Sequence, residues 1–237
     1  MKFVFVTLFP NLIKPYFEDS IMKRAIEKNI FSIEFINFRE FSNNKHKKVD
    51  DTPIGGGAGM VLSIQPLNDT LKYLKTKYPN SKIIFLTPVA KTFNQNDAKR
   101  LSKEEVIIFV SGRYEGFDER IIEEWADEVL SIGDFILSGG ELASMVIADA
   151  IARNIEGVLG NQNSLEIESF EENLLEAPSF TKPNSYKKIK NSEVISDFLK
   201  GNHSIISSLK KELALSKTKY HRPDIYKKFI IRKKYEK

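Results

Sequence analysis

The chain is predicted to be an α/β protein built on a mainly parallel sheet, and three observations support this prediction. Short runs of β-branched and aromatic residues recur along the first two thirds of the sequence. Stretches with helical spacing of apolar residues separate these runs, and loops that carry glycine follow the later ones. Strands that alternate with helices are typical of a parallel sheet, because parallel neighbours need crossover connections.

The first elements follow directly from composition. Residues 2–8 read KFVFVTL and predict a buried strand. Residues 18–28 predict a helix with Asp19 or Ser20 as its cap, and residues 32–38 alternate partly and predict a second strand.

The middle of the chain continues the pattern. Residues 41–60 are polar and then rich in glycine, which predicts a loop, and no Lys-Ser/Thr pair follows the glycines as a Walker phosphate loop would require. The runs KIIFLT and VIIFV predict strands at 82–87 and 106–110. Helices are predicted at 64–77, 94–101 and 118–126.

The stretch 131–143, SIGDFILSGGELA, joins a predicted strand at 129–132 to a predicted helix at 141–153. Ser138 and Glu141 have the spacing of a capping box, in which the two side chains satisfy amides at a helix start. The helix is apolar on nearly all sides and should therefore be buried. A glycine-rich turn is a weak signal, so an ordinary tight connection is an equal alternative to a ligand-binding loop.

The loops that follow residues 87, 110 and 132 are expected to share one pocket. In open α/β sheets, ligands bind beyond the carboxyl ends of the strands. A Rossmann dinucleotide site would place glycines directly after the first strand, where this chain has LFPN instead. A nucleotide-like ligand would therefore be held by a different architecture.

Composition limits the class of protein. The 237 residues are 41% hydrophobic and 29% charged, as in ordinary globular domains, and no apolar run is long enough to span a bilayer. With no cysteine, disulfides, thiolate zinc sites and cysteine nucleophiles are excluded. We expect a cytoplasmic protein, and the sequence offers no cluster of metal ligands.

Charge divides the chain into three parts. Residues 181–237 hold 16 Lys and Arg against 5 Asp and Glu, whereas 161–180 hold five glutamates and no basic residue. We therefore predict an α/β domain over 1–160, an acidic linker over 161–180 and a basic helical domain over 181–237. The basic domain favours a polyanionic partner such as nucleic acid, although a solvated lysine-rich surface would look the same. Its helices are predicted at 190–200, 203–215 and 222–233.

Five motifs together resemble the bacterial tRNA (guanine-N1)-methyltransferases of the SPOUT superfamily of trefoil-knotted methyltransferases. They are GGGAGM (55–60), SGRYEGFDER (111–120), SIGDFILSGGEL (131–142), GVLG (157–160) and GNH (201–203). The resemblance covers nearly the whole chain. It implies a deep trefoil knot in the parallel-sheet domain, S-adenosylmethionine as methyl donor, a homodimer, and a C-terminal domain that binds tRNA. The implied product is 1-methylguanosine at tRNA position 37, beside the anticodon.

The resemblance also implies site residues. The family's cofactor-binding positions correspond here to Pro88, Gly112, Tyr114, Glu115, Ile132, Gly133, Asp134, Phe135, Ile136, Leu137, Gly139 and Gly140. Its substrate-binding positions correspond to His46, Asp50, Gly55, Gly56, Gly57, Gly59, Asn202, His203 and Arg222. Without the resemblance, the first six of these would belong to a surface loop, and the last three could cap or solvate helices.

Two residues correspond to the family's catalytic positions. Arg153 matches the catalytic arginine, whose guanidinium would stabilise negative charge on guanine O6; a helix C-terminal cation is the alternative. The general base of the family is an aspartate, and Glu168 stands at its position, with Glu166 as a rival. Two other readings stay open, namely a knotted methyltransferase with another RNA target and an RNA-binding protein without activity, and this departure is the only hint of the latter.

Overall fold

The computed structural model of the protein describes residues 1–160, 168–186, 190 and 193–235. The chain forms two compact units, Met1–Gly160 and Asn161–Lys237, which we call the N-terminal and the C-terminal unit. In the described part of the chain, none of the helices has the length and hydropathy that crossing a membrane requires.

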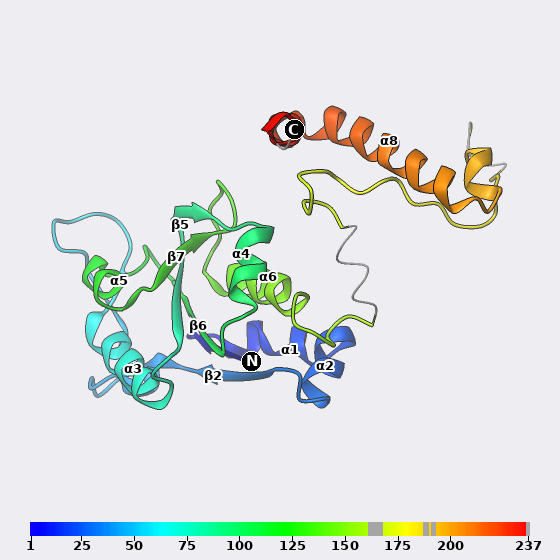
Figure 1. Ribbon diagram of the computed structural model, residues 1–237. Coiled ribbons are helices and arrows are strands. Elements are labelled where there is room, and N and C mark those ends of the chain that lie inside the picture. The colour runs from blue at the N-terminus through cyan, green and yellow to red at the C-terminus, as the bar shows by residue number, and fades with distance from the viewer. Residues whose placement is uncertain (161–167, 187–189, 191–192, 236–237) are drawn as a thin grey trace. The chain divides into compact units, whose positions relative to one another are not determined.

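Five strands form the sheet of the N-terminal unit, and all of their pairings are parallel. The spatial order is β2-β1-β6-β5-β7, so β6 is the central strand and β2 and β7 are the edge strands (Figure 1). The strands are β1 (Lys2–Val6), β2 (Ser32–Ile36), β5 (Lys82–Thr92), β6 (Val106–Ser111) and β7 (Glu128–Ser131). The predicted α/β class with a parallel sheet is confirmed.

Helices cover both faces of this sheet, as the crossover connections require. One face packs against α1 (Lys14–Phe17), α2 (Ser20–Glu27), α4 (Gln95–Leu101) and α6 (Glu141–Ala152). The other face packs against α3 (Ile64–Lys77) and α5 (Glu119–Trp125).

Because both faces are covered, alternate residues of one strand enter two different cores. In β1, Phe3 and Phe5 belong to the first cluster, and Val4 and Val6 belong to the second. The Phe5 ring lies 5.5 Å, centroid to centroid, from the rings of Phe17, Phe35 and Phe109. This packing accounts for the continuous apolar run at the start of the sequence.

Several predicted boundaries are wrong. The helix expected over 18–28 spans Ser20–Glu27, and its predicted cap Asp19 is confirmed, since the Asp19 carboxylate accepts a hydrogen bond from the Ser20 amide. A separate short helix, α1, precedes it at Lys14–Phe17. The strand expected to end at residue 38 ends at Ile36, and a 3₁₀ turn, Phe38–Phe41, follows. Another 3₁₀ turn, Pro10–Leu12, precedes α1. Within the predicted loop, β3 (Asp50–Asp51) pairs antiparallel with β4 (Val61–Leu62).

The described part of the C-terminal unit contains a 3₁₀ turn, Ser196–Leu199, and the helices α8 (His203–His221) and α9 (Pro223–Tyr235). Its small core includes Ala214, Thr218, Ile225 and Phe229. The Thr218 hydroxyl accepts a hydrogen bond from the Leu175 amide and donates one to the Ala214 carbonyl, so it ties the upstream segment to α8.

Among the described residues of 190–200, the predicted helix is reduced to the 3₁₀ turn Ser196–Leu199. The Val194 amide donates to the Asn184 carbonyl over 2.9 Å, so this segment pairs with upstream chain instead of forming its own helical ladder. The helix predicted over 203–215 continues to His221, and the one predicted from residue 222 begins at Pro223.

Candidate functional site

A cavity of about 370 Å³ lies at the carboxyl ends of β6 and β7 and beside the irregular middle part of β5, where the sequence predicted a shared pocket. Residues 86–89, 112–117, 130–133 and 135–140 line most of it. The backbone of these loops is held together by hydrogen bonds, including one from the Gly140 amide to the Gly112 carbonyl at 2.8 Å. The segment after the edge strand β7 therefore returns to the end of the central strand β6.

Two glycines are required where these loops meet. A Cβ on Gly140 would lie 2.9 Å from both the Gly112 nitrogen and the Ser111 Cα, which are backbone atoms that cannot rotate away. A Cβ on Gly112 would lie 2.9 Å from the Phe117 ring. The cavity thus depends on main chain packed directly against main chain.

A buried ion pair supports the same junction. Glu141, whose side chain is 2% exposed, lies 2.9 Å from Arg113 Nε through Oε2 and accepts a hydrogen bond from the Thr7 hydroxyl at 2.7 Å through Oε1. Arg113 also donates to the Ser138 carbonyl and stacks over the Phe9 ring.

The predicted capping box is therefore wrong. Helix α6 begins at Glu141 with Gly140 as its N-cap, and no side chain caps it. The Glu141 carboxylate binds Arg113 and Thr7 instead. Sequence spacing could not reveal this, because Thr7 lies 134 residues away.

Eleven of the twelve residues predicted to bind a cofactor line the cavity. These are Pro88, Gly112, Tyr114, Glu115, Ile132, Gly133, Phe135, Ile136, Leu137, Gly139 and Gly140. Asp134 is the exception, and it is exposed beside the cavity wall. Sequence reasoning missed the contribution of Arg113, which lines the cavity from the buried ion pair.

The loop predicted to face the substrate joins the cavity wall at one end. The Glu115 amide donates to the Met60 carbonyl at 2.8 Å, and a Cβ on Gly59 would collide with the Glu115 side chain. Gly55, Gly56, Gly57 and Gly59 all have positive φ angles. Ile54 at the far end of the loop is 95% exposed, and His46 is exposed as well, whereas Asp50 is half-buried in β3.

Arg153 lies at the opposite end of α6 from the cavity. It caps the helix C-terminus, while Ala143 near the N-terminus lines the cavity. Ten residues of α-helix separate the two positions, which is about 15 Å along the axis. Within one chain, Arg153 is therefore remote from the cavity.

A tyrosine and an aspartate accompany Arg153. The Tyr16 hydroxyl donates to Asp149 Oδ1 at 2.8 Å, and Asp149 is one helical turn before Arg153. Burial, with the Asp149 hydrogen bond and charge, raises the pKa of Tyr16 to about 12. The nearby positive charge of Arg153 acts in the opposite direction.

The remaining predicted residues belong to the C-terminal unit. Glu168 and His203 line one open groove of that unit, and Asn202 caps α8 by accepting hydrogen bonds from the Ser204 and Ile205 amides. The Arg222 guanidinium lies 6.0 Å from the centre of the Phe170 ring. Glu166, the rival base, lies outside the described residues.

Arg222 also forms a local ion pair. It donates through two nitrogens to Asp224, at 3.0 and 2.8 Å. These hydrogen bonds lower the pKa of the exposed Asp224 to about 2. Arg222 therefore remains at the surface with one carboxylate partner.

Comparison with known proteins gives one consistent result. Residues 1–228 match the family described as tRNA (Guanine-1)-methyltransferase TrmD. A tRNA (guanine-N(1)-)-methyltransferase of Sulfurovum sp. (strain NBC37-1) is 64% identical over 97% of this chain and 100% of its own length. A protein of the same name from Campylobacter curvus (strain 525.92) is 59% identical over the whole of both chains.

Proposed function

The chain belongs to the tRNA (guanine-1)-methyltransferase family and is a tRNA guanine-N1 methyltransferase, and on that premise we propose how it works. We propose that it transfers the methyl group of S-adenosylmethionine to N1 of guanosine 37, beside the anticodon of tRNA. The observation that supports this most directly is the cavity beside β5 and the carboxyl ends of β6 and β7, where eleven predicted cofactor residues meet.

The residues of the cavity fit S-adenosylmethionine. Glycines at 112, 139 and 140 let the loops around the cavity pack closely, because a Cβ at each would collide with neighbouring protein atoms. Main-chain donors and acceptors of 132–137 can bind an adenine edge without a charged group. Glu115 supplies a carboxylate that complements a cationic methyl donor.

When bound, S-adenosylmethionine supplies a methyl group activated by a sulfonium. The protein must then make guanine N1 nucleophilic, because that nitrogen carries a proton. We assign proton removal to the Glu168 carboxylate, so that N1 can form its bond to the methyl carbon while the carbon–sulfur electron pair stays on sulfur. Loss of the proton places negative charge on O6, and the Arg153 guanidinium would stabilise it.

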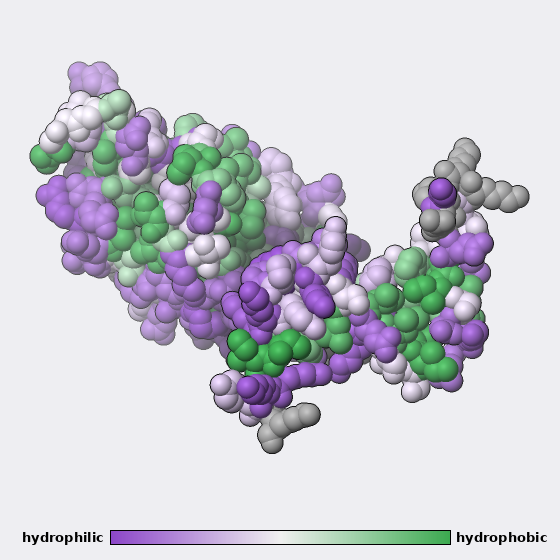
Figure 2. Space-filling model, turned by 90° about the horizontal axis from the view of Figure 1, so that it is seen from above, coloured by the Kyte–Doolittle hydropathy of each residue, from purple (hydrophilic) through white to green (hydrophobic). Residues whose placement is uncertain are grey.

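The position of Arg153 supports a homodimeric active site. Within one chain it lies at the far end of α6 from the cavity, so one site needs the cavity of one protomer and Arg153 of its partner. Leu142 and Val146 are each about half exposed on one side of α6. Phe9 and Leu12 are also exposed, and they lie a few residues before Tyr16, which contacts the same helix through Asp149. Apolar areas reach the surface of the N-terminal unit among polar ones (Figure 2). A second copy of the chain would cover this apolar face.

The other expected features stay part of the proposal. The C-terminal unit, with its excess of Lys and Arg, is proposed to bind the tRNA backbone. The return of Gly140 to the end of β6 supports a trefoil knot in the N-terminal unit, since the segment that follows the edge strand β7 comes back to the end of the central strand.

The function is tested by incubating the protein with S-adenosylmethionine labelled in its methyl group and with bulk tRNA. The label should appear as 1-methylguanosine, and digestion should map it to position 37. Label at another nucleoside or at a ribose hydroxyl would contradict the proposal.

A subunit complementation experiment tests the dimeric site. Val89→Arg places a cation in the cavity at a residue that is 90% exposed, so it should block the cofactor without unfolding the chain. Arg153→Ala removes the guanidinium. Mixed dimers of the two inactive variants should regain activity, because one of their two sites combines an intact cavity with an intact Arg153. A site built within one chain would show no recovery.

A further inference from the structure

Strand β5 has an irregularity that shapes the cavity. Leu130 of β7 is the partner of both Leu86 and Lys91, so the four residues 87–90 between them have no partner in β7. Three of these four, Thr87, Pro88 and Val89, line the cavity. The form of this wall, which we call the β5 bulge (87–90), therefore depends on how its two ends are held.

The far end of the β5 bulge is held by an ion pair. Lys91 Nζ lies 2.8 Å from Asp97 Oδ1, and the other carboxylate oxygen of Asp97 accepts a hydrogen bond from the Asn94 amide at 3.2 Å. Burial of the Asp97 side chain, which is 7% exposed, would raise its pKa. The hydrogen bonds from Lys91 and Arg100 outweigh burial and hold the pKa below its ordinary value, so Asp97 is a carboxylate at neutral pH.

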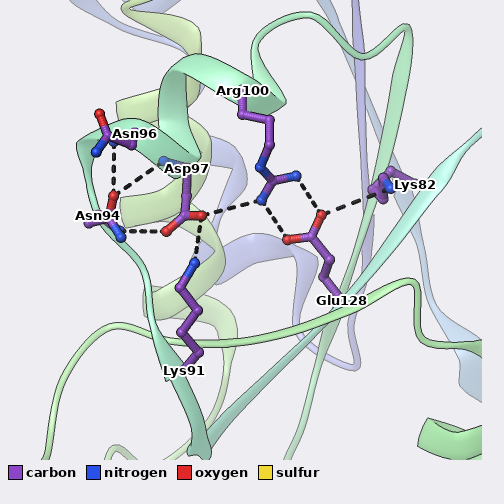
Figure 3. Close-up of polar contacts among 7 residues, drawn as sticks. All are labelled: Lys82, Lys91, Asn94, Asn96, Asp97, Arg100 and Glu128. Carbon is purple, nitrogen blue, oxygen red and sulfur yellow. Dashed lines mark hydrogen bonds and ion pairs between the residues drawn. The ribbon is translucent and has the colours of Figure 1, made fainter.

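The ion pair continues back to the near side of the bulge (Figure 3). Arg100 of α4 contacts Asp97 Oδ1 at 3.3 Å and binds both carboxylate oxygens of Glu128 at 2.7 Å each. Glu128 is the β7 residue opposite Ile84, which precedes the bulge. We call Lys91, Asp97, Arg100 and Glu128 the clamp.

We propose that the clamp is a positioning element that fixes the register of the β5 bulge and thereby sets the affinity of the cavity for S-adenosylmethionine. This inference rests on the proposed role of the cavity. None of the four clamp side chains lines the cavity, so they act through the bulge. Strand pairing alone specifies register weakly where a ladder is interrupted, and bulges beside sites serve to aim side chains.

The energetics favour positioning over simple stabilisation. Taking a carboxylate out of water offsets much of what its partners contribute, so a largely buried ion pair is weak evidence for stability. A bidentate Arg–carboxylate contact instead fixes geometry, because two parallel hydrogen bonds allow one orientation. The clamp connects Lys91, at the far end of the bulge, to Glu128 of β7, which lies opposite Ile84 before the near end. A fixed distance between these two points fixes the shape of the bulge.

The first test is Asp97→Asn in the full chain. Calorimetry should show an S-adenosylmethionine Kd raised about tenfold, within the range of coupling energies between packed sites. The KM for S-adenosylmethionine should rise in parallel. The KM for tRNA, and kcat at saturating S-adenosylmethionine, should stay within about twofold of the wild-type values.

Arg100→Gln and Glu128→Gln form a double-mutant cycle. Each should raise the S-adenosylmethionine Kd, and the double variant should bind no more weakly than Arg100→Gln alone, because Glu128 joins the clamp through Arg100. Additive effects would show that Arg100 and Glu128 act independently and would contradict the clamp.

A matched control separates positioning from general stability. Glu34 accepts hydrogen bonds from Lys77 at 2.7 Å and Tyr78 at 2.6 Å at the other edge of the same sheet. Glu34→Gln should lower the melting temperature comparably and leave the S-adenosylmethionine Kd unchanged. An equal rise in Kd for Glu34→Gln, or an unchanged Kd for Asp97→Asn, would overturn the inference.

Lys91→Gln and the wild-type protein provide two further tests. If Asp97→Asn does not fold, Lys91→Gln removes the exposed partner alone, and its S-adenosylmethionine Kd should rise about threefold; an unchanged Kd there counts against the clamp. A wild-type protein that binds no S-adenosylmethionine would instead contradict the proposed function of the cavity itself.

Discussion

The two units present their candidate residues in different ways. In the N-terminal unit the cavity is built largely from main chain, with Gly140 packed on the backbone of β6 and buried charges beneath it. In the C-terminal unit Asn202, His203 and Arg222 are exposed side chains on or beside helices. A small ligand needs a shaped and pre-formed cavity, whereas an RNA backbone can be bound by charges on a surface. Substitutions should therefore act sterically in the first unit and electrostatically in the second.

The largest effect on turnover is expected for Glu168→Gln. A change in cofactor binding in this variant would contradict the division of roles between the two units. The substitution nearly preserves shape and removes the base, so kcat should fall by about 10²–10⁴-fold. Cofactor affinity should not change, because the cavity belongs to the other unit. Single-turnover methyl transfer and calorimetry measure the two effects.

Glu176→Gln is the control, since it also removes a glutamate from the acidic segment. Its kcat for methyl transfer should stay close to the wild-type value, and so should that of Glu166→Gln. Turnover like that of the wild type in Glu168→Gln would exclude it as the base, and a loss confined to Glu166→Gln would move the role to that residue.

Gly140→Ala tests whether close main-chain packing shapes the cavity of the N-terminal unit. The added methyl group would lie 2.9 Å from main-chain atoms of residues 111 and 112, and such overpacking typically costs about 1–3 kcal/mol of unfolding free energy. The S-adenosylmethionine Kd should rise about tenfold or more as the loops separate. Chemical denaturation and calorimetry provide both values.

Gly160→Ala is the matched substitution, because open space surrounds that position. It should leave both the unfolding free energy and the Kd near their wild-type values. Equal effects at the two glycines would show that main-chain packing does not define the cavity.

The double substitution Lys227→Gln with Lys228→Gln tests whether the C-terminal unit binds tRNA by its surface charge. Both residues are exposed on α9. Each lost phosphate contact should weaken tRNA binding and reduce the slope of log affinity against log salt by about 1. Filter binding at several salt concentrations measures the slope. The S-adenosylmethionine Kd should not change.

Lys23→Gln with Lys28→Gln in the N-terminal unit removes the same charge from α2 and its end. If that pair weakened tRNA binding as much, net charge alone would explain the effect. The C-terminal surface would then have no special role.

The smallest effect concerns stability at high pH. Because the pKa of Tyr16 is raised to about 12 by burial and by Asp149, folding favours its neutral form. This contribution is complete below the ordinary tyrosine pKa of about 10 and is lost as the pH rises through about 12. The phenolate absorbance should be titrated for the wild-type protein and for Tyr16→Phe. The difference between the two curves should show one tyrosine that titrates at about pH 12. Asp149→Asn should lower its pKa.

Local patterns predicted the elements whose cause is local. Helix α3 begins and ends where its apolar spacing placed it, and the cores of β1, β5 and β6 follow from continuous apolar runs. The extension of β5 to Thr92 was not predictable, because Lys91 and Thr92 are held by pairing with β7 rather than by their own composition.

Long-range partners account for the other differences. The role of Glu141 depends on Thr7 and Arg113, and the bend before Ser196 depends on pairing with Asn184. The three loops that form the cavity followed from the general rule for parallel sheets, whereas its individual binding residues were anticipated only through the family resemblance. The clamp was invisible in sequence, because its four charged residues come from three elements.

The loop at Ile54 offers a way to observe RNA binding directly. Its side chain is 95% exposed, open space surrounds Gly55 and Gly56, and the chain has no cysteine. Ile54→Cys would therefore give the chain one thiol, available for a fluorophore at the end of the loop proposed to face the substrate. Fluorescence from that position would report the arrival and departure of tRNA in real time, separately from methyl transfer.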